Sequence, residues 1–178
     1  APFTSLRKEI IHRQIANEKF IVAADTPLFQ FRQKITQNNY LRYSINGIFK
    51  DTGIYCDTHP DPNRWKKIST AYGLCLSPYK YSGKNIILFL QRDGGWSMKG
   101  MPSLAWAEET INEIRRHTDR PIIVRVHPRD NKLKKNQKKM TQGFQHHKDV
   151  KVSAPESKFD EDLKDCWAVV NHNSSATV

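Results

Sequence analysis

Short apolar runs separated by polar segments are the main pattern of the second half of the chain. Three such runs lie at residues 85–90, 122–126 and 167–170, and the second is rich in β-branched residues. A run that is apolar at nearly every position is typical of a strand covered on both faces, as in a parallel sheet. A shorter run at 150–152 predicts a further strand.

Helical spacing appears between these runs. Residues 102–117 carry Leu104, Ala107, Ile111 and Ile114 on one predicted face, and 158–165 reads as a short acidic helix. Alternation of strand and helix is the pattern of a doubly wound parallel sheet. We therefore expect an α/β fold, a Rossmann-like parallel sheet with flanking helices.

The first part of the chain is patterned less regularly. Helices are expected at 6–15 and 65–72, a buried strand at 19–25 and another strand at 43–49. Turn-forming residues at 73–83 suggest a boundary, which gives the domains 1–84 and 85–178. The last residues resemble the start of a helix whose body is missing, so we expect the second domain to be truncated at its C-terminus.

Composition narrows the class of protein. With 38% hydrophobic and 26% charged residues the chain should fold, and no apolar run approaches the ~20 residues of a membrane span. It also lacks a secretory signal pattern, so a soluble cytoplasmic protein is expected. Three cysteines without CxxC spacing indicate neither a disulfide framework nor a zinc site. The formal charge of +11 favours polyanionic partners: nucleic acid, nucleotide donors or anionic glycans.

Candidate chemistry lies where three of the predicted strands end. The carboxyl edge of a parallel sheet is where ligands bind, and glycine amides, serine hydroxyls, imidazole and guanidinium groups there suit a phosphate. Each loop alone also fits an ordinary tight turn, a helix cap or a surface imidazole. The candidate phosphate-binding residues are Gly94, Gly95, His127, Arg129, Ser174 and Ser175.

A basic run follows the His-Pro-Arg turn directly. Most such runs are solvated helix faces, but this one could also contact nucleic acid or another polyanion. Its members are Lys132, Lys134, Lys135, Lys138 and Lys139.

Three segments together resemble a known family. They are the strand with the glycine loop that follows it at 91–100, VRVHPR at 124–129, and VVNHNSSATV at 169–178. They are similar to the nucleotide-donor domain of GT-B-type glycosyltransferases, nearest to the bacterial capsule Kdo-transferase, sialyltransferase and teichoic-acid polymerase group. The resemblance covers about residues 85 to 178. Residues 1–84 would then be the end of an acceptor-side α/β region.

The resemblance implies that His127, Ser174 and Ser175 contact the phosphate leaving group of a nucleotide-activated sugar, with Arg129 as a helper. Positive groups there would stabilise the departing phosphate, so no metal or other cofactor is expected. The run 160–162 fits the Asp-x-Asp pattern of metal-dependent transferases, but acidic residues at a helix start more often interact with the helix dipole.

An inverting transfer would also need a base, for which Asp93 is the first candidate and Asp25 the second. The acceptor would be a glycan or a modified DNA base. Two alternatives remain open: a non-catalytic nucleic-acid-binding module, and a glycerol-phosphate transferase of the teichoic-acid kind.

Overall fold

The computed structural model describes residues 2–25, 41–47, 53–55, 58–79, 81–93, 98–128, 130, 133–154 and 156–174. The chain divides into two compact units, Ala1–Ser77 and Pro78–Val178, and each is described by itself. Among the described residues, no helix has the length and apolar character needed to span a bilayer.

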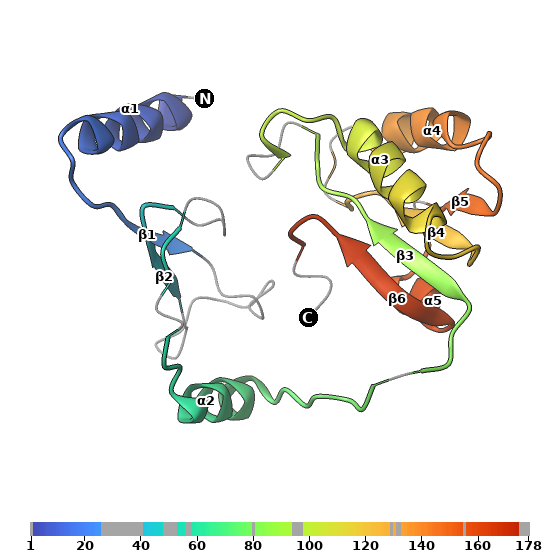
Figure 1. Ribbon diagram of the computed structural model, residues 1–178, viewed down its shortest axis with the longest axis horizontal. Coiled ribbons are helices and arrows are strands. Elements are labelled where there is room, and N and C mark those ends of the chain that lie inside the picture. Colours follow the sequence, from blue (N-terminus) through green and yellow to red (C-terminus); the bar gives the residue numbers. More distant parts are fainter. Residues whose placement is uncertain are drawn as a thin grey trace. The chain divides into compact units, whose positions relative to one another are not determined.

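The second unit is built on a four-stranded parallel sheet (Figure 1). This confirms the expected mixed α/β content with a parallel sheet flanked by helices. Its strands are β3 (Asn85–Phe89), β4 (Ile122–Arg125), β5 (Val150–Val152) and β6 (Cys166–Asn171).

The strands lie in the order β5-β4-β3-β6. The chain moves outward from β3 to β4 and β5, then returns across the sheet to place β6 on the other side of β3. The direction of winding therefore reverses between β3 and β6, so the order corresponds to strands 3-2-1-4 of a Rossmann-like sheet, its first half and the next strand. In open α/β sheets, ligands bind outside the carboxyl ends of the strands at such a reversal.

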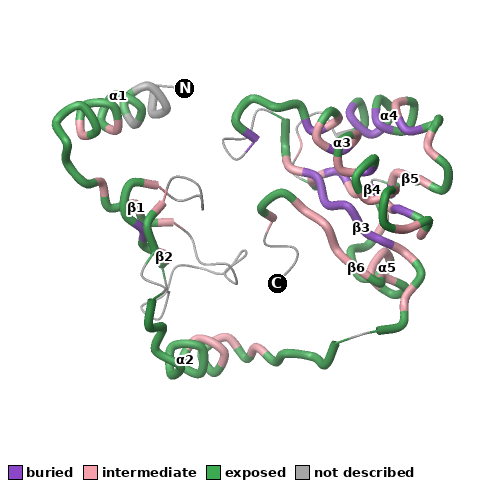
Figure 2. The backbone as a smooth tube through the Cα atoms, viewed as in Figure 1, coloured by how far each residue is buried: buried purple, intermediate pink, exposed green. Residues whose placement is uncertain are grey.

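Helices α3 (Ser103–Arg115) and α4 (Leu133–Gly143) cover one face of this sheet. Alternate strand residues such as Leu88 and Val124 point to that face, since successive side chains of a strand point to opposite sides. They pack with Ala107 and Ile111 of α3 and Phe144 after α4. Figure 2 shows the buried residues gathered on β3 and on these helices. The helical spacing predicted for 102–117 is thereby confirmed.

The opposite face of the sheet carries the short helix α5 (Phe159–Leu163). Phe89 of β3 stacks on Phe159, with ring centroids 5.3 Å apart. Both Phe89 and Ile87 are buried on this face, so β3 is covered on both sides, as its uniformly apolar sequence predicts.

Strand β6 is less buried than its sequence suggests. Trp167 is 43% exposed, and its ring lies under the guanidinium of Arg120, 4.5 Å from the ring centroid. At the start of the same strand, a Cβ placed on Gly83 would lie 2.5 Å from the carbonyl oxygen of Cys166. The backbone before β3 thus approaches β6 more closely than a side chain allows.

In the residues of the first unit that the structure describes, a two-stranded antiparallel sheet occurs together with two helices (Figure 1). Its elements are α1 (Pro2–Ala16), β1 (Val22–Asp25), β2 (Arg42–Ile45) and α2 (Pro62–Tyr72). Helix α2 begins at Pro62, three residues before the expected start, because the Asp61 side chain caps it by accepting a hydrogen bond from the Asn63 amide, 2.9 Å away.

The prediction of a buried strand at 19–25 was wrong in two respects. The strand is shorter, and Val22 is 72% exposed. An apolar run is buried only where a second layer packs on it. Here β1 pairs with β2, and its residues alternate between exposed and half-buried. The strand expected at 43–49 spans Arg42–Ile45, and residues 48–50 lie outside the described part of the chain.

Candidate functional site

Three loops leave the carboxyl ends of adjacent parallel strands in the second unit. One follows β3, one follows β4 and one follows β6, so they share a single edge of the sheet. Of the predicted site residues, Asp93, His127 and Ser174 lie in these loops and are described. The topology therefore brings these three segments to the edge where the winding reverses.

The loop after β3 is tied to the start of α3. One carboxylate oxygen of Asp93 accepts hydrogen bonds from both the backbone amide and the hydroxyl of Ser103, at 2.7 and 2.6 Å. Ser103 is completely buried. A carboxylate at this position satisfies an unpaired donor of the first helical turn and interacts favourably with the helix dipole. The observed role of Asp93 is therefore to cap α3, and its role as a base stays a prediction.

The loop after β4 turns sharply at the His-Pro motif. The amide of Asp130 donates to the carbonyl of His127 across 3.0 Å, which closes the turn. The side-chain amide of Asn136, a buried residue of α4, donates to the Asp130 carboxylate at 2.8 Å. These contacts anchor the turn to the following helix and leave the half-buried His127 at the strand end.

The loop after β6 is held by a hydrogen bond between a side chain and the backbone. The side-chain oxygen of Asn171 accepts a hydrogen bond from the Ser174 amide at 2.5 Å. The ring of His172 meets Trp106 of α3 edge-on, with centroids 5.7 Å apart. This contact connects the β6 loop to the helix that Asp93 caps.

His172 and Trp106 were not predicted as site residues. A signal for His172 was available, since it follows an apolar strand directly in the same stretch as Ser174. For Trp106 no such signal exists, because its place depends on how α3 lies across the end of the sheet.

Several predicted residues cannot be placed in this site. Gly94, Gly95, Arg129 and Ser175 lie outside the described residues. Asp25 belongs to the first unit, where Arg42 of the neighbouring strand pairs with its carboxylate.

A second polar cluster lies on the α5 side of the sheet and was not foreseen. Arg125 of β4 forms an ion pair with Asp162 and donates to the carbonyl of Ser157 at 2.7 Å. The Asp162 carboxylate also accepts from the hydroxyls of Ser153 and Ser157, at 2.7 and 3.1 Å. The guanidinium lies 5.8 Å from the Phe159 ring centroid. Of the predicted Asp-x-Asp residues, Asp162 is thus engaged in a structural ion pair.

The predicted basic run forms much of α4. Lys134, Lys135, Lys138 and Lys139 are exposed, while Asn136, Gln137 and Met140 are buried against the sheet. The four described lysines therefore share the outward side of one helix. Lys132 lies outside the described residues.

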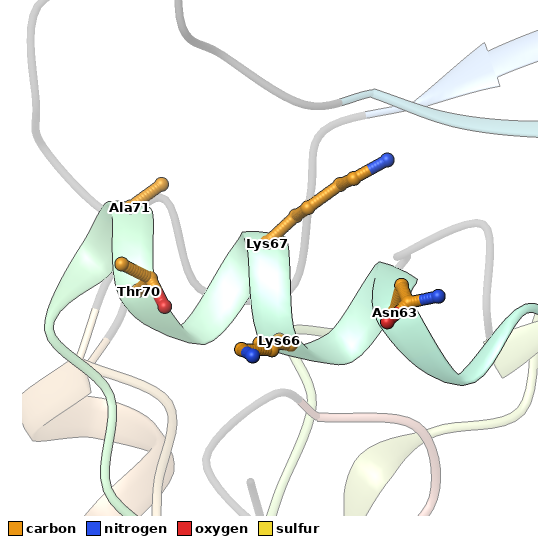
Figure 3. A pocket seen from close by; sticks show the side chains of 5 residues that line it. All are labelled: Asn63, Lys66, Lys67, Thr70 and Ala71. Atoms are coloured by element: carbon orange, nitrogen blue, oxygen red, sulfur yellow. The ribbon is translucent and has the colours of Figure 1, made fainter.

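A surface hollow in the first unit runs along α2 (Figure 3). The described residues that line it all come from this one helix, and Lys66 and Lys67 extend to different sides of it. None of its described lining residues is a predicted site residue. The lining residues are Asn63, Lys66, Lys67, Thr70 and Ala71.

Comparison with known proteins adds no assignment. The chain has no match among protein-family models, curated proteins or solved structures.

Proposed function

We propose that the second unit binds the nucleotide-activated donor of a GT-B-type glycosyltransferase. The observation that carries this proposal is the strand order β5-β4-β3-β6, which puts the ends of β3, β4 and β6 side by side where the winding reverses. This is where Rossmann-like sheets bind the phosphates of nucleotides. The sequence supplies imidazole and hydroxyl groups in those loops.

In the proposed reaction, the oxygen of an acceptor hydroxyl attacks the anomeric carbon of the donor sugar. The bond from that carbon to the donor phosphate breaks, and the phosphate leaves with the electron pair. His127 and Ser174 would donate hydrogen bonds to the leaving phosphate, whose negative charge grows in the transition state. The hydroxyl proton would pass to a base.

Asp93 is the proposed base, and its contacts with Ser103 give it a fixed position at the end of β3. The phosphate would then bind beside the β4 and β6 loops, because the first amide of α3 is already taken by Asp93.

Calorimetric titration of the protein with CMP, CDP and UDP tests the donor site. We expect one of them to bind, and His127→Ala to weaken that binding about 10- to 100-fold, the range for losing a hydrogen bond to a charged group. His117→Ala is the matched control. His117 follows the C-terminal end of α3 and so lies at the opposite edge of the sheet. Unchanged affinity in His127→Ala, or no binding of any nucleotide, would contradict the proposal.

Transfer of glycerol phosphate is distinguished by the product. Mass spectrometry of an acceptor incubated with CDP-glycerol would then show addition of a glycerol phosphate group. Addition of a sugar from a nucleotide sugar supports the glycosyltransferase instead.

The lysines of α4 favour a second function, binding of nucleic acid or another polyanion. Four ammonium groups on one exposed helix face can track a phosphate backbone. Tyr79 and Tyr81 are both largely exposed, with ring centroids 6.3 Å apart, and Trp65 is partly exposed. Such rings can stack on bases. An enzyme that glycosylates modified DNA bases would combine the α4 lysines with the donor site.

Salt-dependent DNA binding tests the lysine face. Replacing Lys134, Lys135, Lys138 and Lys139 with Gln should lower DNA affinity and reduce the salt slope by up to about 3.6, at ~0.9 per phosphate contact. Nucleotide affinity should be unaffected. A control with Gln at four exposed lysines of the first unit has the same net charge and should retain most of the slope; an equal loss would mean that net charge alone matters. Those control lysines are Lys8, Lys19, Lys66 and Lys67.

A further inference from the structure

Two consecutive histidines after α4 and a glutamate of α3 converge in the second unit. The Nε2 atoms of His146 and His147 lie 2.9 and 2.7 Å from the same carboxylate oxygen of Glu108. The two imidazole rings lie close together, with centroids 4.1 Å apart. One ligand atom from each of the three residues falls within 4.8 Å of the others.

The packing of α3 against the end of α4 creates this cluster. A Cβ on Gly143, the last residue of α4, would lie 3.2 Å from a methyl carbon of Leu104, so glycine lets the two helices approach closely. One turn further along α3 is Glu108. The segment after α4 is fixed by Phe144, a core residue whose carbonyl accepts from the His147 amide at 3.0 Å.

The three side chains differ in how firmly they are held. The side chain of His147 is only 10% exposed and packs near the Phe144 ring, whereas that of His146 is 64% exposed. Glu108 projects from the second turn of a regular helix. His147 is therefore held by packing and the backbone of Glu108 by its helix, while His146 lies at the surface, where an ion can enter.

Two imidazole nitrogens and one carboxylate oxygen form a donor set that binds Zn²⁺ in proteins. Zinc bonds of about 2.0–2.2 Å at a tetrahedral angle separate ligand atoms by roughly 3.4 Å. The observed nitrogen–oxygen distances are shorter by about half an ångström, a change that rotation of the exposed His146 and the Glu108 side chain can supply. Harder ions such as Mg²⁺ prefer oxygen ligands and are disfavoured by this set.

We propose that Glu108, His146 and His147 bind a zinc ion with three protein ligands and a water molecule. The bound ion would connect α3 to the segment between α4 and β5. The site is independent of the proposed donor site, since it uses none of the strand-end loops.

The test uses the full chain without a histidine tag, freed of metal with EDTA. Titration with Zn²⁺ in competition with a chromophoric chelator should give one ion per chain. Co²⁺ in place of zinc should give the visible absorption bands of a tetrahedral site. His146→Ala and Glu108→Gln should each lower zinc affinity at least tenfold, because loss of groups that merely orient a ligand already costs 10–100-fold.

His117→Ala is the matched control, since His117 pairs with Glu113 of α3, at 3.3 Å, and among the described residues no second histidine joins this pair. It should leave zinc affinity unchanged. Because His146 is exposed, His146→Ala should fold normally even if His147→Ala does not, and circular dichroism would verify this. No stoichiometric binding by the unmodified chain, or binding that survives both His146→Ala and Glu108→Gln, would overturn the proposal.

Discussion

The polar cluster around Arg125 shows how one residue can hold two layers together. Arg125 belongs to β4 and its partner Asp162 to α5, and the two side chains are only 15% and 12% exposed. Removing one member of a buried ion pair leaves the other charge without compensation, and this usually costs more than the pair itself contributes.

We therefore expect Asp162→Ala to lower the free energy of unfolding by about 3–5 kcal/mol. Urea denaturation followed by circular dichroism measures this difference. Asp160→Ala is the control, because Asp160 is exposed on the same helix and should change stability by less than about 0.5 kcal/mol. Equal losses of stability in the two variants would show that the ion pair with Arg125 does not cause the loss.

Sequence reasoning could place Asp160, Glu161 and Asp162 at the start of a helix, and this is confirmed. It could not distinguish Asp162 from its neighbours. The three acidic residues are equivalent in a one-dimensional pattern, and only the direction of α5 relative to β4 decides which of them meets Arg125.

At the scale of elements, helix α3 is the best-predicted feature of the chain. Its apolar spacing specified both the helix and its buried face, because all four apolar positions pack on one layer. The capping contact could not be predicted in the same way. Asp93 lies ten residues before Ser103, so the contact depends on how the intervening loop folds.

The capping contact can be separated from the proposed catalytic role. Asp93→Ala should lower the free energy of unfolding by about 1 kcal/mol, the usual cost of losing a helix cap. Asp93→Asn should cost much less, because an amide oxygen still accepts from Ser103. If Asp93 is also the base, Asp93→Asn should abolish sugar transfer while preserving stability.

Thermal or urea denaturation of both variants, beside a transfer assay, measures the two effects. Glu109→Ala, at an exposed position in the middle of α3, is the control for loss of an acidic residue. Full transfer activity in Asp93→Asn would limit Asp93 to its capping role.

Strand β1 illustrates where the pattern fails. Its sequence is largely apolar, yet its residues alternate between exposed and half-buried, and Val22 is 72% exposed. Burial depends on a second layer, and the sequence of a strand does not say whether such a layer packs against it.

At the scale of the second unit, the sequence predicted parallel strands but not their order. Alternating strands and helices are compatible with β6 beside β5 or beside β3. The return of β6 to β3 follows from the direction of one crossover, and it decides which loops share an edge. The chemistry of His127 and Ser174 suggests that both bind the same phosphate. The strand order supports this, because it places the loops after β4 and β6 at one edge of the sheet.

The position of β6 beside β3 also affects the order of folding. Ile86 pairs with Ile122 and Ile122 with Val150, whereas Asn85 pairs with Cys166, more than twice as far along the chain. Each doubling of loop length raises the free-energy cost of closing the loop by only about 0.6 kcal/mol. We therefore expect β6 to pair later than β4, but still to pair. Pulsed hydrogen exchange during refolding should protect the amides of β4 before those of β6; simultaneous protection would contradict this sequence of events.

Until β6 arrives, one edge of β3 has unpaired amides and carbonyls. Because β3 is also the most apolar strand of the unit, this edge is a template to which another molecule can add a strand. Late docking of β6 therefore makes the folding intermediate prone to self-association, and the yield of refolding should fall as protein concentration rises.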